Sequence, residues 1–252
     1  MHRTLITLAT YNEIENLPTL VVEILRFAPT ADVLVIDDNS PDGTGKWCEK
    51  SAADEPRLKV LHRSGKLGLG TATLAGMRYA IDQGYEWVLN MDADFSHHPR
   101  HLPALLACRD EPAAGRAIDV MIGSRYVPGG RIEGWGWKRH FMSRAVNTAA
   151  RVLLGLKSRD CSGSYRCYRT RLLADLDFAA IRSRGYSFQE EILFLLARQG
   201  ATIEETPITF VDRQRGQSKI NTGEALAAGR ILVQLGLGRC CRSAESHAAV
   251  SS

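Results

Sequence analysis

The sequence predicts an α/β fold with a mainly parallel central sheet and helices on both faces. Three observations predict it: short apolar runs alternate with amphipathic stretches, the runs have the length of strands, and acidic residues follow two of them. Alternating strands and helices form right-handed βαβ units, whose parallel sheet is covered on both faces. Ligands of such sheets bind at the carboxyl ends of the strands, so the acids mark the expected site.

Most of the expected sheet lies in the first half of the chain. Apolar runs predict strands at residues 5–9, 33–36, 58–61, 87–91 and 120–122, with helices between them at 17–27, 43–51 and 71–83. The pattern changes after Tyr126, because VPGGRIEGWGWK (residues 127–138) is rich in glycine and tryptophan and is expected to be a mobile loop. Helices at 141–156, 188–198 and 222–237 and a strand at 202–210 complete the expected elements.

Charge is unevenly distributed along the 252 residues. The net charge is +4, yet residues 125–171 carry eleven Lys and Arg against two acids, which leaves 21 basic and 26 acidic residues elsewhere. A basic segment in an otherwise mildly acidic protein indicates an anionic partner, such as a phosphate, a nucleic acid or an acidic membrane surface. A solvated helix face is the alternative.

Nothing in the sequence indicates secretion or a membrane span. The start, MHRTLITLAT, does not resemble a signal peptide, and no apolar run approaches the ~18 residues that a span needs. Six cysteines are present without a Cys-x-x-Cys pair or metal-finger spacing. We therefore expect reduced thiols in a cytoplasmic protein.

The stretch VLNMDADFSHHP (residues 88–99) places Asp92 and Asp94 where an apolar run ends. Two like charges so close are tolerable if solvent screens them, if one carboxyl is protonated, or if a cation lies between them. A divalent cation held by two carboxylates can bind the diphosphate of a nucleotide sugar. Three histidines that could add ligands, or only cap and pack, follow the acids: His97, His98 and His101.

Three other kinds of site compete with that interpretation. In a phosphatase of the haloacid dehalogenase type the first Asp of Asp-x-Asp is a nucleophile, but that motif normally opens its domain and here four expected strands precede it. A dehydrogenase would need G-x-G-x-x-G, and Thr73 replaces the last glycine of GLGTAT. A Walker A loop fails because Trp47 follows Gly45–Lys46.

Six motifs occur in one order along the chain: ATYNEIENLP, VLVIDDNSPDGTG, KLGLGTA, MDADFSHHP, GSRYVPGG and QRGQSKI. Their order and approximate spacing resemble those of the family-2 glycosyltransferases of GT-A fold. The resemblance is greatest to the polyprenyl (dolichyl) phosphate mannosyltransferases. The resemblance implies an inverting transfer of mannose from GDP-mannose to a polyprenyl (dolichyl) phosphate, with Mg²⁺ or Mn²⁺ as cofactor. A UDP-sugar donor is the alternative, and a non-catalytic nucleotide-sugar-binding subunit is a further one.

The resemblance also implies roles for particular residues. Nucleotide-contacting positions are matched by Tyr11, Glu13, Ile36 and Asp38. The metal–diphosphate segment is matched by Asp92, Ala93 and Asp94, with Asp92 and Asp94 at the cation. Positions that close over the diphosphate are matched by Arg125, Arg213 and Lys219. Ser96 stands where many members have a glutamine ligand, which leaves a third protein ligand in doubt.

A lipid phosphate is anionic near neutral pH, so it can attack the sugar without a protein base, and catalysis reduces to positioning and charge neutralisation. Cations that could receive this phosphate lie in the basic segment: Arg131, Arg139 and Arg144. The expected catalytic set is Asp92, Asp94, Arg125 and Arg131. Glu190 and Glu191 fall where family members carry acids facing the acceptor, although adjacent helical acids are usually solvated.

The expected domains and partners follow from the resemblance. Residues 1–223 should form the catalytic domain, 224–238 a helix that contacts a membrane or partner, and 239–252 a disordered tail. Expected partners are the nucleotide-sugar donor, the polyprenyl-phosphate acceptor and the cytoplasmic membrane surface, with a membrane anchor protein as a further candidate, but no nucleic acid. An apolar stripe on helix 141–156 suits either an interfacial helix or a core-packed one, and comprises Phe141, Met142, Ala145, Val146, Ala149, Val152 and Leu153.

Overall fold

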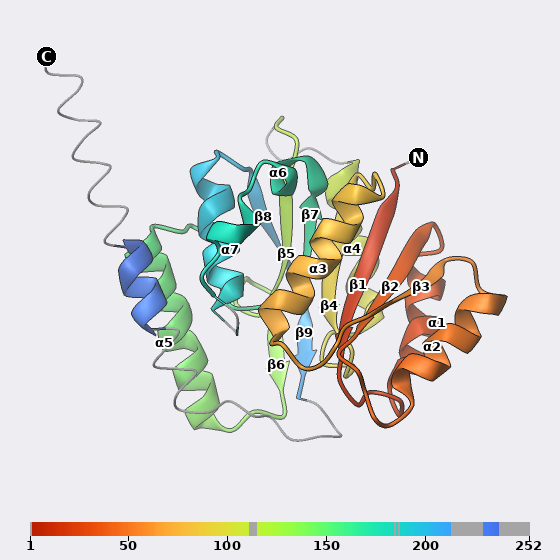
Figure 1. Ribbon diagram of the computed structural model, residues 1–252. Helices are drawn as coiled ribbons and strands as arrows, with labels where there is room; N and C mark the ends of the chain where they lie inside the picture. The colour runs from red at the N-terminus through yellow and green to blue at the C-terminus, as the bar shows by residue number, and fades with distance from the viewer. Residues whose placement is uncertain (1, 111–114, 184, 186, 213–228, 237–252) are drawn as a thin grey trace, which may run out of the picture.

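A computed structural model describes residues 2–110, 115–183, 185, 187–212 and 229–236. A seven-stranded sheet has the order β3-β2-β1-β4-β7-β5-β8, and β6 pairs with β9 in a second sheet (Figure 1). The strands are β1 Thr4–Thr10, β2 Ala31–Asp37, β3 Leu58–His62, β4 Trp87–Asp92, β5 Val120–Ser124, β6 Arg131–Glu133, β7 Arg166–Arg169, β8 Ile203–Pro207 and β9 Thr209–Val211. The helices are α1 Leu17–Phe27, α2 Thr44–Asp54, α3 Leu69–Asp82, α4 Leu102–Leu106, α5 Trp137–Leu154, α6 Thr170–Ala174 and α7 Phe188–Arg198.

The central sheet is mainly parallel, which confirms the prediction. Strands β3, β2, β1 and β4 run parallel to their neighbours, and β5 runs parallel to β8. The exception is β7, which pairs antiparallel with both β4 and β5. The sequence analysis missed β7, because a four-residue strand with arginine at each end has too short an apolar run to be recognised.

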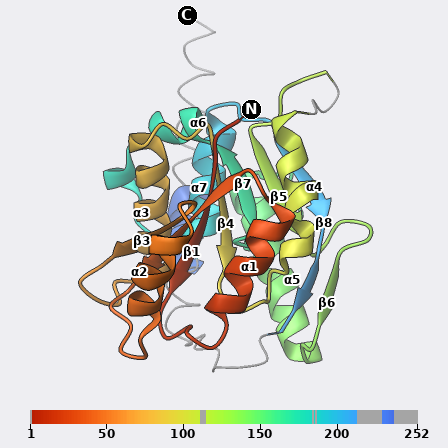
Figure 2. The same cartoon turned by 90° about the vertical axis from the view of Figure 1, so that its right-hand side faces the viewer.

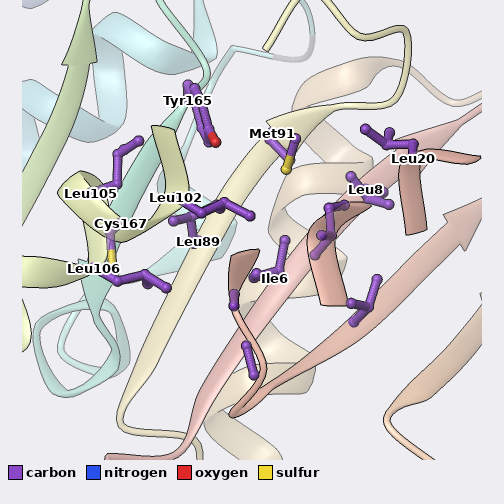
Figure 3. Packing of buried hydrophobic residues seen from close by; sticks show 14 of the residues in the cluster. Ile6, Leu8, Leu20, Leu89, Met91, Leu102, Leu105, Leu106, Tyr165 and Cys167 are labelled. Carbon is purple, nitrogen blue, oxygen red and sulfur yellow. The ribbon is translucent and has the colours of Figure 1, made fainter. Parts of the chain in front are cut away.

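Helices cover both faces of the sheet (Figure 2). Side chains alternate between the two faces along each strand, so both faces carry apolar residues that the helices bury. On one face Ile6 and Leu8 of β1 pack with α1, α2 and α4 (Figure 3). On the other, Leu5 packs with a second cluster formed by α3, α5, α6 and α7. Helix α3 lies close to the sheet because Gly76 faces it, where a Cβ would come within 2.9 Å of the Ile36 side chain.

Two expectations for the second half of the chain were wrong. The strand expected at residues 202–210 is divided into β8 and β9, because the chain leaves β5 after Pro207 and pairs next with β6. The loop expected at residues 127–138 contains β6 and the first residues of α5, which begins at Trp137. β6 pairs with β9, which lies more than 70 residues further along the chain, so no local sequence pattern indicates that β6 is a strand.

The C-terminal helix expected at residues 222–237 is described only at 229–236, which are helical and lie beside α5 (Figure 1). Gly236 allows this close approach, because a Cβ there would come within 3.1 Å of the Leu153 carbonyl oxygen. The expected tail at 239–252 lies outside the described residues. Within the described ranges, no helix is both long and apolar enough to cross a membrane.

Candidate active site

The carboxyl ends of β2, β1 and β4 lie next to one another at one edge of the sheet. The register pairs Ala9 of β1 with Ile36 on one side and with Asp92 on the other. Asp37 and Asp38 therefore lie two strands from Asp92, about 10 Å away at ordinary strand spacing. The two acidic pairs meet at a single edge, where the sequence placed the site.

A serine hydroxyl fixes each carboxylate of the Asp-x-Asp pair. The Ser164 hydroxyl donates to Asp92 Oδ1 at 2.8 Å, and Ser96 donates to Asp94 Oδ1 through its hydroxyl at 2.5 Å and its N–H at 3.0 Å. Between the acids and Ser96, Phe95 takes a left-handed φ of 62°, which is unfavourable for a bulky residue and turns the chain sharply at the site.

The three histidines near the pair all accept main-chain hydrogen bonds. His97 Nδ1 accepts from the Asp92 N–H at 3.1 Å, and burial lowers the pKa of this imidazole. His97 is therefore neutral, and its 3.6 Å contact with Asp92 Oδ2 is not an ion pair. His98 accepts from the Arg100 N–H and His101 from the Thr209 N–H, so capping and packing account for all three.

The donor set at this edge fits a hard divalent cation. No group of three or more His, Cys, Asp and Glu side chains placed to hold a metal occurs in the described part of the chain. Asp92 and Asp94 nevertheless provide two carboxylates whose orientation is already set. Mg²⁺ is commonly bound by one or two carboxylates together with substrate phosphates and water, so two protein ligands suffice.

The residues expected to contact a nucleotide lie along the ends of β1 and β2. Tyr11 is exposed, with the Lys66 ammonium 4.6 Å from its ring centroid. Glu13 accepts from the Asn16 side-chain amide at 2.9 Å. Ile36 is 1% exposed and lines, with Asp92 and Ser164, a hollow of about 10 Å³.

Asp38 is buried beside Arg63, with Oδ1 and Nη1 2.9 Å apart. Burial raises the pKa of the Asp38 carboxyl, and the Arg63 guanidinium opposes that rise. Neither of these two atoms has a hydrogen bond of good geometry to a described residue. Both atoms are enclosed by protein, so the ion pair with Arg63 fixes the orientation of the Asp38 carboxylate.

Arg125 is buried directly after β5 and forms a bidentate ion pair with Asp160. Asp160 accepts from Arg125 Nε and Nη2, both at 2.7 Å, and from its main-chain N–H at 3.0 Å. Burial disfavours the charged form of both groups, but the opposite charge of the partner outweighs this effect. The pKa of Arg125 is therefore raised and the pKa of Asp160 is lowered. Asp160 is not among the residues predicted from the sequence; its one signal is that it is one of two acids among eleven basic residues at 125–171.

Aromatic rings and a tight turn surround Arg125. Its guanidinium carbon lies within 5.6 Å of the ring centroids of Tyr126, Trp135 and Phe210. Gly130 makes the turn possible, because a Cβ there would come within 2.7 Å of the Ser124 carbonyl oxygen. This packing gives Arg125 one fixed place behind the edge of the sheet.

Basic residues follow on β6 and α5. Arg131 is exposed on β6, and its N–H donates to the Ile208 carbonyl. Arg139 pairs with Asp212 at 2.8 Å and stacks on Trp135, whereas Arg144 is exposed. Asp212 also lines a pocket of about 400 Å³ that contains Asp94, Phe95 and His98.

Glu190 and Glu191 are both buried at the start of α7, so the expectation that one of them is solvated was wrong. Glu191 accepts from the N–H groups of Arg182 and Ser183. Burial raises the pKa of the Glu190 carboxyl to about 7. The two remaining expected contacts, Arg213 and Lys219, lie outside the described residues.

Comparison with known proteins shows the family to which this chain belongs. The profile of the glycosyl transferase family 2 matches residues 6–177, which is more than half of the chain. The chain belongs to glycosyl transferase family 2. It is a glycosyltransferase, as the motifs of the sequence predicted.

Two relatives match this glycosyltransferase over most of its length. An undecaprenyl-phosphate mannosyltransferase of Micrococcus luteus is 46% identical over 88% of this chain and 88% of the relative. A polyprenol monophosphomannose synthase of Mycolicibacterium smegmatis is 43% identical over 87% of this chain and 81% of the relative. The resemblance to polyprenyl phosphate mannosyltransferases is thereby confirmed.

Solved structures share the fold of this glycosyltransferase. Glucosyl-3-phosphoglycerate synthase from Mycobacterium tuberculosis, in complex with Mn²⁺, uridine diphosphate and phosphoglyceric acid, aligns with a TM-score of 0.64 and 21% identity over 95% of this chain and 78% of that one. The same enzyme with Mg²⁺ and uridine diphosphate aligns with a TM-score of 0.64 over 95% of this chain and 79% of that one. These similarities confirm the predicted GT-A fold.

Proposed function

We propose that this protein transfers a mannosyl residue from GDP-mannose to a polyprenyl (dolichyl) phosphate and forms a lipid-linked monosaccharide. The observation that carries the proposal is the pair Asp92 and Asp94, oriented by serines at the carboxyl edge of the sheet beside a 400 Å³ pocket. The 46% identical relative is named for mannose transfer to undecaprenyl phosphate, which supports the same acceptor class here.

The ends of β1 and β2 are suited to bind the nucleoside of the donor. Tyr11 offers an exposed aromatic ring on which a base can stack. Asp38 lies directly after β2, where its ion pair with Arg63 orients the carboxylate next to the expected nucleoside site. Guanine and uracil both stack and both carry N–H donors, so the choice of GDP over UDP comes from the relatives' mannose chemistry rather than from these residues.

Asp92 and Asp94 would hold Mg²⁺ or Mn²⁺ together with the donor diphosphate. When bound, such a cation neutralises the negative charge that develops on the leaving nucleoside diphosphate. Arg125 lies directly after β5 behind the same edge, where the bidentate pair with Asp160 fixes its guanidinium group. Arg213 and Lys219 are proposed to close over the diphosphate, by the motif that they share with the family.

The acceptor phosphate is proposed to bind among the arginines of β6 and α5. Arg131 and Arg144 are exposed, and Arg139 is held at the edge of the pocket by Asp212. Planar guanidinium groups bind phosphate in a bidentate manner. Because this phosphate is already ionised, positioning it against the sugar carbon is the main task of these residues.

A polyprenyl acceptor requires the site to work at a membrane surface, so we propose that the protein is peripheral on the cytoplasmic face. The expected stripe on α5 supports this, because Phe141 is 68% exposed and Val152 is 72% exposed. The buried residues of α5 are instead Asn147, Ala150 and Leu154. Within the described residues, Phe141 and Val152 therefore do not pack in the core, and a membrane or an anchor protein can cover them.

The test is a donor panel of radiolabelled GDP-mannose, UDP-glucose and UDP-N-acetylglucosamine with a short polyprenyl phosphate, followed by solvent extraction of labelled lipid. We expect Mg²⁺- or Mn²⁺-dependent transfer from GDP-mannose alone. Labelled lipid formed from a UDP-sugar would show that this UDP-sugar, and not GDP-mannose, is the donor. Full activity in excess chelator would contradict the metal site.

Asp92→Asn and Asp94→Asn are expected to lower kcat at least about 100-fold, with the thermal unfolding curve preserved. Asp82→Asn, an exposed acid at the end of α3, is the matched control and should retain full activity. Equal activity of all three variants would show that the carboxylate pair is not the reacting centre.

A further inference from the structure

We infer that Ser164 is a positioning residue for the transfer reaction: its hydroxyl holds the Asp92 carboxylate in the orientation that binds the divalent cation. The inference rests on the proposed function and deepens it, because it assigns a role to a residue 72 positions from Asp92 and outside the Asp-x-Asp motif. The Ser164 hydroxyl lies 2.8 Å from Asp92 Oδ1.

The sheet register places these two residues opposite each other. β4 and β7 run antiparallel and pair Asn90 with Arg166. Two residues further along β4 is Asp92, and two residues before Arg166 is Ser164, so continuation of the register makes them cross-strand neighbours. Cross-strand pairs have Cβ atoms about 5 Å apart, which is the reach of a hydroxyl–carboxylate hydrogen bond.

Tyr165, the next residue, supports the main chain of the same aspartate. The His97 ring stacks on Tyr165 with centroids 4.9 Å apart, and His97 Nδ1 accepts the Asp92 N–H. The Tyr165 hydroxyl also donates to the His98 carbonyl at 3.3 Å. Ser164 and Tyr165 thus hold the side chain and the backbone of Asp92 together, one directly and one through His97.

The segment before Ser164 is itself rigid, so its hydroxyl is presented from a fixed place. Asn147 Oδ1 accepts from the N–H groups of Cys161 and Ser162, and Asp160 Oδ1 accepts from the Gly163 N–H at 3.0 Å. A donor that is already ordered loses little conformational entropy when it bonds Asp92.

A neutral hydroxyl is well suited to this task. The Asp92 side chain is 30% exposed, so without a partner it would sample several rotamers. A lysine or arginine would order it but would also neutralise the charge that attracts a cation. Ser164 orders Oδ1 and leaves the carboxylate its full negative charge.

The test compares Ser164→Ala with the wild-type chain by an EPR titration of Mn²⁺ in the presence of GDP, and by kcat and KM for the donor. We expect Mn²⁺ to bind about 10- to 100-fold more weakly in the variant, since partners of metal ligands have effects of this size. The unfolding midpoint should be preserved, because water can replace the hydroxyl at the partly exposed Asp92. Ser51→Ala on α2, away from the site, should bind Mn²⁺ as the wild type does.

A second pair of variants separates the hydroxyl from the packing. Ser164→Thr and Ser164→Val have the same shape, but only Thr keeps the donor, so Thr should restore Mn²⁺ affinity and Val should not. Equal Mn²⁺ affinity of the wild type, the Ala variant and the Val variant would overturn the inference and leave the proposed function intact. If the wild type itself binds no Mn²⁺ with either GDP or UDP, the proposed function and this inference both fail.

Discussion

The ionisable side chains that are buried behind the carboxyl edge of the sheet include Arg125, Asp160, Arg166 and Glu190, and their charges are compensated unequally. Arg125 and Asp160 neutralise each other in a bidentate pair. Arg166 donates to two main-chain carbonyls, those of Gln189 at 2.7 Å and Cys161 at 2.6 Å. The fourth, Glu190, has an Oε2 atom without a hydrogen-bond partner in the described part of the chain. A buried carboxyl with so little compensation favours its neutral form.

Glu190 makes the stability of the fold depend on pH. In the folded chain the pKa of the Glu190 carboxyl is about 7, against 4.5 for an exposed glutamate. Burial, together with the negative charge of Asp160, outweighs the main-chain hydrogen bond and the positive charges of Arg166 and Arg125. Between these values the folded state holds one more proton than the unfolded state, so the free energy of unfolding falls as the pH rises. Well above pH 7 the free energy of unfolding no longer falls through this group, because Glu190 is ionised in both states.

Glu190→Gln should therefore raise the thermal midpoint at pH 8 and leave it nearly unchanged at pH 4.5. The thermal midpoint of a chain of this length rises by roughly 2–4 °C for each kcal/mol added to the free energy of unfolding. Melting curves of both proteins across this pH range measure the effect, with Glu204→Gln, an exposed acid on β8, as the control. A difference that does not change with pH would contradict the assignment.

The Asp160 carboxylate should be among the most important side chains for stability. Asp160→Asn leaves the buried Arg125 without a counter-charge, which we expect to lower the free energy of unfolding by about 3–5 kcal/mol. Urea unfolding at pH 7 measures it. Glu23→Gln breaks an exposed pair with Arg26 and should change the same quantity by less than about 1 kcal/mol. Similar decreases in the free energy of unfolding of the two variants would show that the buried pair stabilises the fold no more than the surface pair does.

At the scale of the element, α5 combines three features that a soluble helix rarely shows together. Its four basic residues are not balanced by any acid within the helix, it exposes large apolar side chains, and its N-terminal turns carry the arginines proposed for the acceptor. The exposed apolar set is Trp137, Phe141, Met142, Val152 and Leu153. A helix of this composition is attracted to an anionic lipid surface and can insert its apolar side chains there.

Replacing Phe141 or Val152 with serine should weaken binding to anionic vesicles, on the order of tenfold each, because each change removes apolar area from the contact. Sedimentation with anionic and neutral vesicles at low and high salt measures it. Val22→Ser, which alters a similarly exposed valine on α1, is the matched control. Recovery of the wild type in the supernatant under every condition would leave an anchor protein as the partner of α5.

At the scale of the whole molecule, the sheet separates two hydrophobic clusters and brings distant segments to one edge. The first cluster packs α1, α2 and α4, and the second packs α3, α5, α6 and α7. Parts of the site come from the ends of β1, β2 and β4 and from the segment before β7. A ligand at this edge therefore joins elements from both halves of the chain.

Donor binding should stabilise the whole fold in a cation-dependent manner. GDP with Mn²⁺ at 100 times its Kd adds about 2.7 kcal/mol to the free energy of unfolding, which at this chain length is a rise of several degrees in Tm. Thermal shifts with GDP, UDP and ADP, with and without chelator, also identify the preferred base. A larger shift with UDP than with GDP would contradict the proposed donor.

The sequence by itself determined the α/β class, the positions of the first four strands along the chain and the acids at the ends of two of them. This succeeded because apolar runs and helical spacing are local, and because parallel strands present their carboxyl ends at one edge. The same local patterns predicted α1, α3 and α7 close to their observed bounds. The roles proposed for Asp92 and Asp94 come from the family motifs, because composition and spacing alone left the choice open between a metal site and a phosphatase.

Only the tertiary structure decided which residues support those acids and Arg125. Asp160 lies 35 residues from Arg125, and Ser164 lies 72 residues from Asp92. These contacts depend on β7 entering the sheet antiparallel between β4 and β5, and no local pattern encodes a strand order or a register. The exposure of Phe141 and Val152 was likewise undecided in the sequence, because an amphipathic helix has the same spacing whether a protein core or a membrane covers its apolar face.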